Sequence, residues 1–135
     1  MEKIVYTFGV FDLLHPGHLR ILEKAKALGD RLIVGVVFSQ AVREKKGEGR
    51  PIMSLADRME IIRGLKMADS VVVQETFDPS YNLELYGANI FVRGDDWDCP
   101  EGKRKIESMG GQAILLPYSK EYSTTKIIER IKCLS

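Results

Sequence analysis

Short runs of β-branched and apolar residues alternate with helical stretches along this chain, and no other feature constrains its fold as strongly. The runs, each typical of a strand, cover residues 3–7, 31–37, 70–73, 90–92 and 112–116. Apolar residues at helical spacing predict helices at residues 19–28, 54–65, 81–86 and 101–109, and a last helix after residue 123. This alternation predicts a doubly wound, parallel α/β sheet of about five strands, with ligands bound beyond the carboxyl ends of the strands.

The length of 135 residues predicts a single domain over residues 1–135. Apolar residues make up 44% of the chain and charged residues 29%, which is typical of a soluble globular protein. The net charge of +1 argues against nucleic-acid or membrane partners. The chain begins directly with a strand and has no apolar run long enough to span a bilayer, so we expect a cytoplasmic protein. Cys99 and Cys133 show no metal-ligand spacing, and we expect no resident metal site.

Capping residues and breakers predict several helix boundaries. Ser39 is expected to cap a short helix that runs through residue 43, followed by a charged, glycine-containing loop over residues 44–51. Ser54 and Asp57 have capping-box spacing, with aspartate in place of the preferred glutamate, and predict the start of the next helix. Ser123 is expected to cap the last helix, whose apolar stripe is formed by isoleucines.

The junction between the first strand and the first helix holds the most informative stretch. From Phe8 to His18 it runs Phe-Gly-Val-Phe-Asp-Leu-Leu-His-Pro-Gly-His. Unpaired backbone N–H groups and the positive end of the helix dipole meet at such a junction, which therefore suits an anion. Taken alone, His15 and His18 are better explained as capping or core histidines.

The whole stretch resembles the G-x-F-D-x-x-H-x-G-H signature of the small cytidylyltransferase and adenylyltransferase family. The resemblance extends over nearly the whole chain and implies a Rossmann-like nucleotidyltransferase fold and a homodimer. It implies that His15 and His18 donate hydrogen bonds to a nucleoside triphosphate. Asp12 is expected to orient a histidine or to contact the acceptor. The residues implied to bind the nucleotide in this stretch are Phe8, Gly9, Val10, Phe11, Asp12 and Gly17.

Three further segments extend the resemblance. Ser123-Thr124-Thr125 is similar to the family's phosphate-binding turn, which implies that Ser123 and Thr124 bind the β- and γ-phosphates, with Tyr122 and Thr125 beside them. An ordinary helix cap is the alternative. Lys46 matches a lysine that faces the acceptor's phosphate, and Arg58 matches an arginine near the triphosphate, although both also suit a solvated surface. The implied catalytic set is His15, His18, Lys46 and Thr124.

Residues 93–97 bear on the identity of the base. Their sequence, Arg-Gly-Asp-Asp-Trp, resembles the M-G-D-D-W segment of glycerol-3-phosphate cytidylyltransferases, which implies that Arg93, Gly94 and Asp96 lie beside the base. A turn with a buried Trp97 is the alternative. Arg93 in place of methionine is similar to heptose-1-phosphate adenylyltransferases.

The expected reaction is transfer of CMP from CTP to glycerol 3-phosphate or a similar polyol phosphate, with release of pyrophosphate. The first alternative is an adenylyltransferase that makes an ADP-sugar from ATP and a heptose 1-phosphate. The second is a non-catalytic nucleotide-binding module, which is favoured by Tyr118 and Ser39 where the family has an arginine and an aspartate. The partners are thus a nucleoside triphosphate and a small phosphorylated acceptor, and Mg²⁺ is expected to arrive with the triphosphate.

Overall fold

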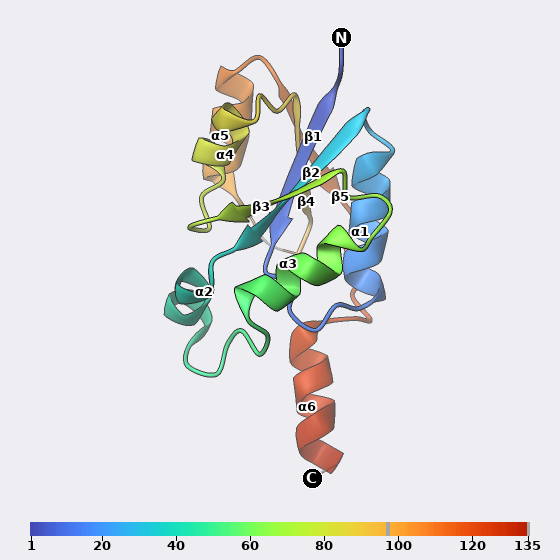
Figure 1. The fold of residues 1–135 in the computed structure, drawn as a ribbon, viewed down its shortest axis with the longest axis vertical. Helices are drawn as coiled ribbons and strands as arrows, with labels where there is room; N and C mark the ends of the chain where they lie inside the picture. The colour runs from blue at the N-terminus through green and yellow to red at the C-terminus, as the bar shows by residue number, and fades with distance from the viewer. Residues whose placement is uncertain (97, 135) are drawn as a thin grey trace.

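The computed structural model describes residues 1–96 and 98–134, which form a five-stranded parallel sheet with helices on both faces (Figure 1). The strands are β1 (Ile4–Gly9), β2 (Arg31–Val37), β3 (Ser70–Gln74), β4 (Ile90–Gly94) and β5 (Gln112–Leu116). Their order in the sheet is β3-β2-β1-β4-β5. The predicted doubly wound α/β fold is confirmed. β1 extends past the predicted residue 7, because its pairing with β2 continues to Gly9 and Val36.

Side chains of successive strand residues point to opposite faces, and each face has its own core. Val5 of β1 packs in the cluster beneath α1 and α3, whereas Tyr6 packs in the cluster on the other face, beneath α4 and α5. The helices are α1 (Pro16–Lys26), α2 (Ser39–Lys46), α3 (Leu55–Arg63), α4 (Ser80–Leu85), α5 (Pro100–Ser108) and α6 (Thr124–Leu134). Because both faces are covered, the strands read as continuous apolar runs.

The strand order reverses between β1 and β4. From β1 the chain winds through β2 to β3 on one side, and then returns to β4 and β5 on the other side. The carboxyl ends of β1 and β4 therefore form the topological switch point, where doubly wound sheets bind their ligands.

The start and the end of α2 differ from the expectation. Ser39 is the first helical residue rather than the cap, and its Oγ accepts a hydrogen bond from Arg58 Nη2 at 2.9 Å. The helix continues to Lys46, beyond the predicted residue 43. Gln40 pairs along the helix with Arg43 and with Glu44, and such i,i+3 and i,i+4 contacts stabilise a charged helix that is too polar to be recognised by periodicity. Lys46 is consequently held on a helical turn.

The two other predicted caps are confirmed. Ser54 Oγ accepts from the backbone N–H of Asp57 at 3.1 Å, and Ser123 Oγ accepts from that of Lys126 at 3.0 Å.

α6 does not bury its isoleucines. Figure 1 shows this helix extending away from the body of the sheet, and none of its residues is buried. Ile131, expected on the apolar stripe, is 56% exposed, since both faces of the sheet are already covered by other helices. The expected homodimer stays a prediction. None of the described helices combines the length and the apolar character needed to cross a membrane.

Candidate active site

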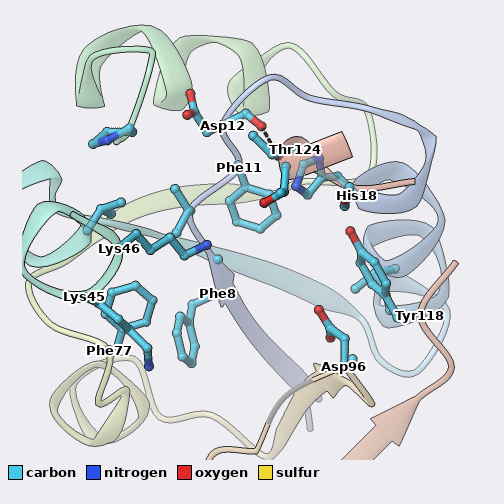
Figure 2. Close-up of a pocket in the computed structure, with 18 of the residues that line it drawn as sticks. Phe8, Phe11, Asp12, His18, Lys45, Lys46, Phe77, Asp96, Tyr118 and Thr124 are labelled. Atoms are coloured by element: carbon cyan, nitrogen blue, oxygen red, sulfur yellow. Dashed lines mark hydrogen bonds between the residues drawn. The ribbon is translucent and has the colours of Figure 1, made fainter. Parts of the chain in front are cut away.

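A pocket of about 400 Å³ opens at the switch point, at the carboxyl ends of β1 and β4 (Figure 2). The predicted site residues that line it are Phe8, Gly9, Val10, Phe11, Asp12, His18, Lys46, Arg93, Gly94, Asp96, Ser123, Thr124 and Thr125. These residues come from the β1–α1 turn, α2, β4 and the start of α6, so four segments that are distant in sequence meet around one space.

The β1–α1 turn is held in a strained conformation. Phe11 and Leu13 have positive φ angles of 54° and 50°, in the left-handed region that non-glycine residues rarely adopt. Each such residue costs on the order of 1–3 kcal/mol. The Phe11 ring is buried in the core beneath α1 and α3, which offsets this cost. The turn brings the chain from β1 back to the N-terminus of α1 over the pocket.

His15 and His18 cap α1 reciprocally. Nδ1 of His15 accepts from the backbone N–H of Gly17 at 3.1 Å, and Nδ1 of His18 accepts from that of His15 at 3.2 Å. A neutral imidazole whose Nδ1 accepts carries its proton on Nε2, so both rings present an Nε2–H donor. The rings are stacked with their centroids 3.8 Å apart. Capping and ligand binding are therefore compatible roles for the same side chains.

The Nε2–H of His15 is buried and has no hydrogen-bond partner among the described residues. A buried donor without a partner costs about 1–3 kcal/mol. A ligand oxygen would remove this cost, and the donor is therefore evidence for an acceptor such as a phosphate next to the capped helix end.

Both imidazoles are neutral at neutral pH. Burial lowers the pKa of His15. Burial, followed by the charges of His15 and Lys46, lowers the pKa of His18 to about 3. Positive potential in the pocket thus comes from lysine, arginine and the helix dipoles, while the histidines act as uncharged donors.

This shift in pKa predicts acid-sensitive stability. Between about pH 6.5 and pH 3 the unfolded chain binds a proton at His18 that the folded chain does not bind, so the free energy of unfolding falls as the pH falls. Within that window the loss is about 1.4 kcal/mol per pH unit for one such group. Urea denaturation at several pH values should show a smaller loss for His18→Gln, which does not titrate there. Identical slopes for the two proteins would contradict the neutral buried state.

The start of α6 is tied to the β1–α1 turn. The hydroxyl of Thr124 donates to the backbone carbonyl of Asp12 at 2.6 Å, and Arg50 Nη2 donates to Thr125 Oγ1 at 3.1 Å. The N-termini of α1 and α6 consequently meet at the same pocket. Two helix N-termini offer backbone N–H groups and favourable dipoles to one polyanion.

Asp12 fastens a loop. Its carboxylate, 3% exposed, accepts from the backbone N–H groups of Ile52 at 2.6 Å and Met53 at 2.9 Å. The expectation that Asp12 orients a histidine or contacts the acceptor does not match this geometry, because both oxygens are directed to the loop. Asp12 instead holds the segment that follows Arg50 against the pocket.

Arg58 does not reach the pocket. It is fully buried, and its guanidinium donates to the backbone carbonyls of Met53, Val10 and Val37 and to Ser39 Oγ, at 2.9–3.1 Å. The expected contact with the triphosphate is therefore not supported. Arg58 ties the pocket-lining segments together from beneath.

Three other predicted residues, His15, Gly17 and Tyr122, do not line the pocket themselves but lie next to residues that do. His15 is in contact with His18, and a Cβ at Gly17 would come within 2.9 Å of the His15 ring, which explains the glycine. The Tyr122 ring lies 6.1 Å from that of His15, and the Arg20 guanidinium lies 5.1 Å from the Tyr122 ring. These residues pack around the two imidazoles next to the pocket.

Arg93, Gly94 and Asp96 line the pocket, and Asp96 lies on the opposite side from Lys46 (Figure 2). Arg93 Nη2 donates to Asp98 at 2.9 Å, and burial, followed by Asp95, raises the pKa of Asp96. Trp97 lies outside the described residues. Tyr118, where the family arginine was expected, lines the pocket, and its hydroxyl would be 3.3 Å from a Cβ at Gly17.

Several residues that line the pocket have no site role predicted from the sequence: Thr7, Ile21, Val42, Lys45, Arg50, Pro51, Phe77 and Tyr118. Lys45 and Arg50 belong to the charged segment next to Lys46, so proximity was the available signal. Phe77 lies in a loop without a motif, so no sequence signal indicated its place in the site. Among the described residues, no cluster of three His, Cys, Asp or Glu side chains is arranged to hold a metal ion.

Comparison with known proteins identifies the family of this chain. Residues 6–130 match the family described as Cytidylyltransferase-like. The chain belongs to the cytidylyltransferase-like family. Its relatives include bifunctional protein HldE of Haemophilus influenzae, 41% identical over 98% of this chain, and that of Alcanivorax borkumensis, 38% identical over 97%. The chain spans 28% of the length of each.

A solved structure of another protein has the same fold as this cytidylyltransferase-like chain. The crystal structure of the lipopolysaccharide core biosynthesis protein from Thermoplasma volcanium superposes with a TM-score of 0.73 at 30% identity, over 88% of this chain and 98% of that one. The fold is therefore shown to be of the nucleotidyltransferase type.

The expectation of CMP transfer to glycerol 3-phosphate is wrong. Relatives that match nearly the whole chain are bifunctional HldE proteins, and this finding favours the first alternative over the glycerol 3-phosphate assignment. Asp95-Asp96 resembled the glycerol-phosphate branch, whereas Arg93 pointed to the heptose branch. The general assignment as a nucleotidyltransferase is confirmed.

Proposed function

We propose that the chain is an adenylyltransferase that transfers AMP from ATP to the phosphate of a sugar 1-phosphate, forming an ADP-sugar and pyrophosphate. The observation that carries the proposal is the buried, unpartnered Nε2–H of His15 beside a pocket where the N-termini of α1 and α6 converge. The HldE relatives, whose matching domain is a heptose-1-phosphate adenylyltransferase, support ATP and a heptose-like acceptor.

The chemistry needs no general base. A phosphate oxygen of the acceptor, already ionised at neutral pH, attacks the α-phosphorus of ATP, and the bond from that phosphorus to the bridging oxygen of pyrophosphate breaks. Catalysis then rests on alignment and on donors directed to the charge that develops on the phosphate oxygens. His15 and His18 are the proposed donors, and the two helix N-termini are proposed to hold the departing pyrophosphate.

Lys46 is proposed to face the acceptor's phosphate. Burial, then the charges of Arg50 and Lys45, lower the pKa of Lys46, whereas Asp12 and Asp96 act in the opposite direction. A partly desolvated ammonium among other cations gains from an added anion. Mg²⁺ is proposed to enter with ATP, where it would neutralise part of the phosphate charge and keep several water ligands.

The test is a pyrophosphate-release assay on the purified chain with Mg²⁺. ATP with a heptose 1-phosphate is expected to give a kcat/KM at least about tenfold above that of CTP with glycerol 3-phosphate, a difference of about 1.4 kcal/mol in transition-state binding. The kcat/KM for ATP with other sugar 1-phosphates should lie between these two values. Tight ATP binding without pyrophosphate release from any pair would favour a nucleotide-binding module and overturn the proposal.

A further inference from the structure

The end of the pocket away from the histidines is apolar and aromatic. Val42 and the rings of Phe8 and Phe77 line it. Figure 2 shows the Phe8 and Phe77 rings on the same side of the pocket as Lys46, whereas Asp96 and Tyr118 lie on the other side. Asp96 and Tyr118 are thus separated from the apolar end of the pocket. This end is therefore available to the second substrate, the acceptor.

Three cationic side chains lie near this apolar end of the pocket. Lys45 Nζ lies 4.4 Å from the centroid of the Phe77 ring, and Lys46 and Arg50 line the same pocket. An aromatic surface beside several cations matches a molecule with one apolar face and one anionic group. A pyranose ring that carries a phosphate has both, because its C–H groups form flat patches. An open-chain polyol phosphate has the anion but no comparable flat face.

A buried polar network fixes the loop that carries Phe77. The Tyr6 hydroxyl donates to Gln74 Oε1 at 2.6 Å and accepts from Asn82 Nδ2 at 2.9 Å, while Gln74 Nε2 donates to the backbone carbonyl of Thr76 at 2.9 Å. All three network side chains are buried. A Cβ at Gly35 would overlap the Tyr6 hydroxyl, so the glycine in β2 provides the room for this network.

The next residues of the loop are bonded as well. Thr76 Oγ1 accepts from the backbone N–H of Asp78 at 3.1 Å, and Asp78 Oδ1 accepts from the backbone N–H and the hydroxyl of Ser80. Phe77 is therefore preorganised, and a ligand that packs on it spends little free energy on ordering the loop.

We infer that Phe77 is a specificity-determining residue, the wall on which the ring of the acceptor sugar packs, so that the site selects cyclic sugar phosphates over open-chain polyol phosphates. This inference rests on the proposed function for the nature of the acceptor. Lys45 Nζ lies against the same ring and helps to orient it.

The experiment compares Phe77→Ala, Phe77→Tyr and the matched control Tyr81→Ala. Tyr81 is an aromatic residue of the neighbouring α4, 74% exposed and outside the pocket. Phe77→Ala is expected to raise the KM for a heptose 1-phosphate at least about tenfold and to leave the KM for ATP within about twofold, since only acceptor packing is lost. Its kcat/KM for glycerol 3-phosphate should stay near wild type. Phe77→Tyr keeps the aromatic face and should keep the preference.

Calorimetric binding of the heptose 1-phosphate, in the presence of a non-hydrolysable ATP analogue, separates this inference from the proposed function. If wild type turns over and Phe77→Ala leaves both the acceptor KM and its binding unchanged, the inference is wrong and the function stands. If no pair turns over but Phe77→Ala still weakens heptose 1-phosphate binding, the proposed function is wrong, whereas the packing of the sugar on Phe77 is supported. A raised KM for ATP alone would place Phe77 at the nucleotide and overturn the inference.

Discussion

Replacement of His18 by glutamine is expected to lower kcat by about 10²–10³-fold, the effect of removing one donor that stabilises transition-state charge. The ring of His18 has two separable roles. Its Nδ1 accepts from the backbone N–H of His15, and its Nε2–H faces the pocket. Glutamine is a natural partner at the third helical position of a capping box, so it preserves the first role and removes the second.

The variant His15→Asn separates the capping role of His15 from its role as a hydrogen-bond donor. Asparagine is among the best N-cap residues, and its side-chain oxygen can accept from the backbone N–H of Gly17 as Nδ1 of His15 does. The buried Nε2–H, however, disappears. We expect a loss in kcat of about 10²-fold or more. Because the variant also removes an unsatisfied buried donor, its stability at neutral pH should equal or exceed that of wild type.

Single-turnover rates and urea denaturation of the two variants provide the measurement. His15→Ala and His18→Ala are the controls, since alanine removes both the donor and the cap and should also lower stability, by about 0.5–2 kcal/mol for the cap. If the asparagine and glutamine variants keep rates within about threefold of wild type, the histidines serve the helix alone and the electrostatic argument for catalysis fails.

The fold was accessible from the sequence because its information is local. Each strand is a short β-branched run, and the helices between them carry apolar spacing or a Ser cap, as at Ser54 and Ser123. α2 was predicted too short because charged residues, which give no periodic signal, extend it to Lys46. The exposure of α6 was not predictable, since an apolar stripe shows what a helix can bury and not whether a partner surface is present.

The site was only partly accessible, for a different reason. A motif identifies residues near a ligand but not the atoms that each side chain contacts. Arg58 and Asp12 both fit the family pattern, yet their charges are satisfied by backbone groups in the structure. Phe77 reaches the pocket through a network that joins β1, β3 and α4, and no local pattern reports such a long-range contact.

Replacement of Asp12 by asparagine is expected to lower kcat/KM for the acceptor by about 10²-fold, because Asp12 holds the loop that carries Arg50. Its two carboxylate oxygens accept from two backbone N–H groups. Hydrogen bonds to a charged group contribute about 1.5–3 kcal/mol each. Asparagine offers one oxygen, and its NH₂ group would face the second N–H, donor against donor. The segment from residue 47 to residue 53 should therefore detach, and Arg50 should lose its place beside Thr125.

Limited trypsin digestion monitors this detachment, because Lys45 and Lys46 are potential cleavage sites next to the segment. Asp30→Asn is the matched control. Asp30 also accepts from a backbone N–H, that of Lys3 at 2.7 Å, but at the opposite end of the sheet from the pocket. Asp12→Asn should be cleaved faster than wild type and should lose acceptor kcat/KM, whereas Asp30→Asn should show neither effect. Loss of kcat/KM without faster cleavage would mean that Asp12 contacts the acceptor directly, because a loop that stays closed cannot transmit the change.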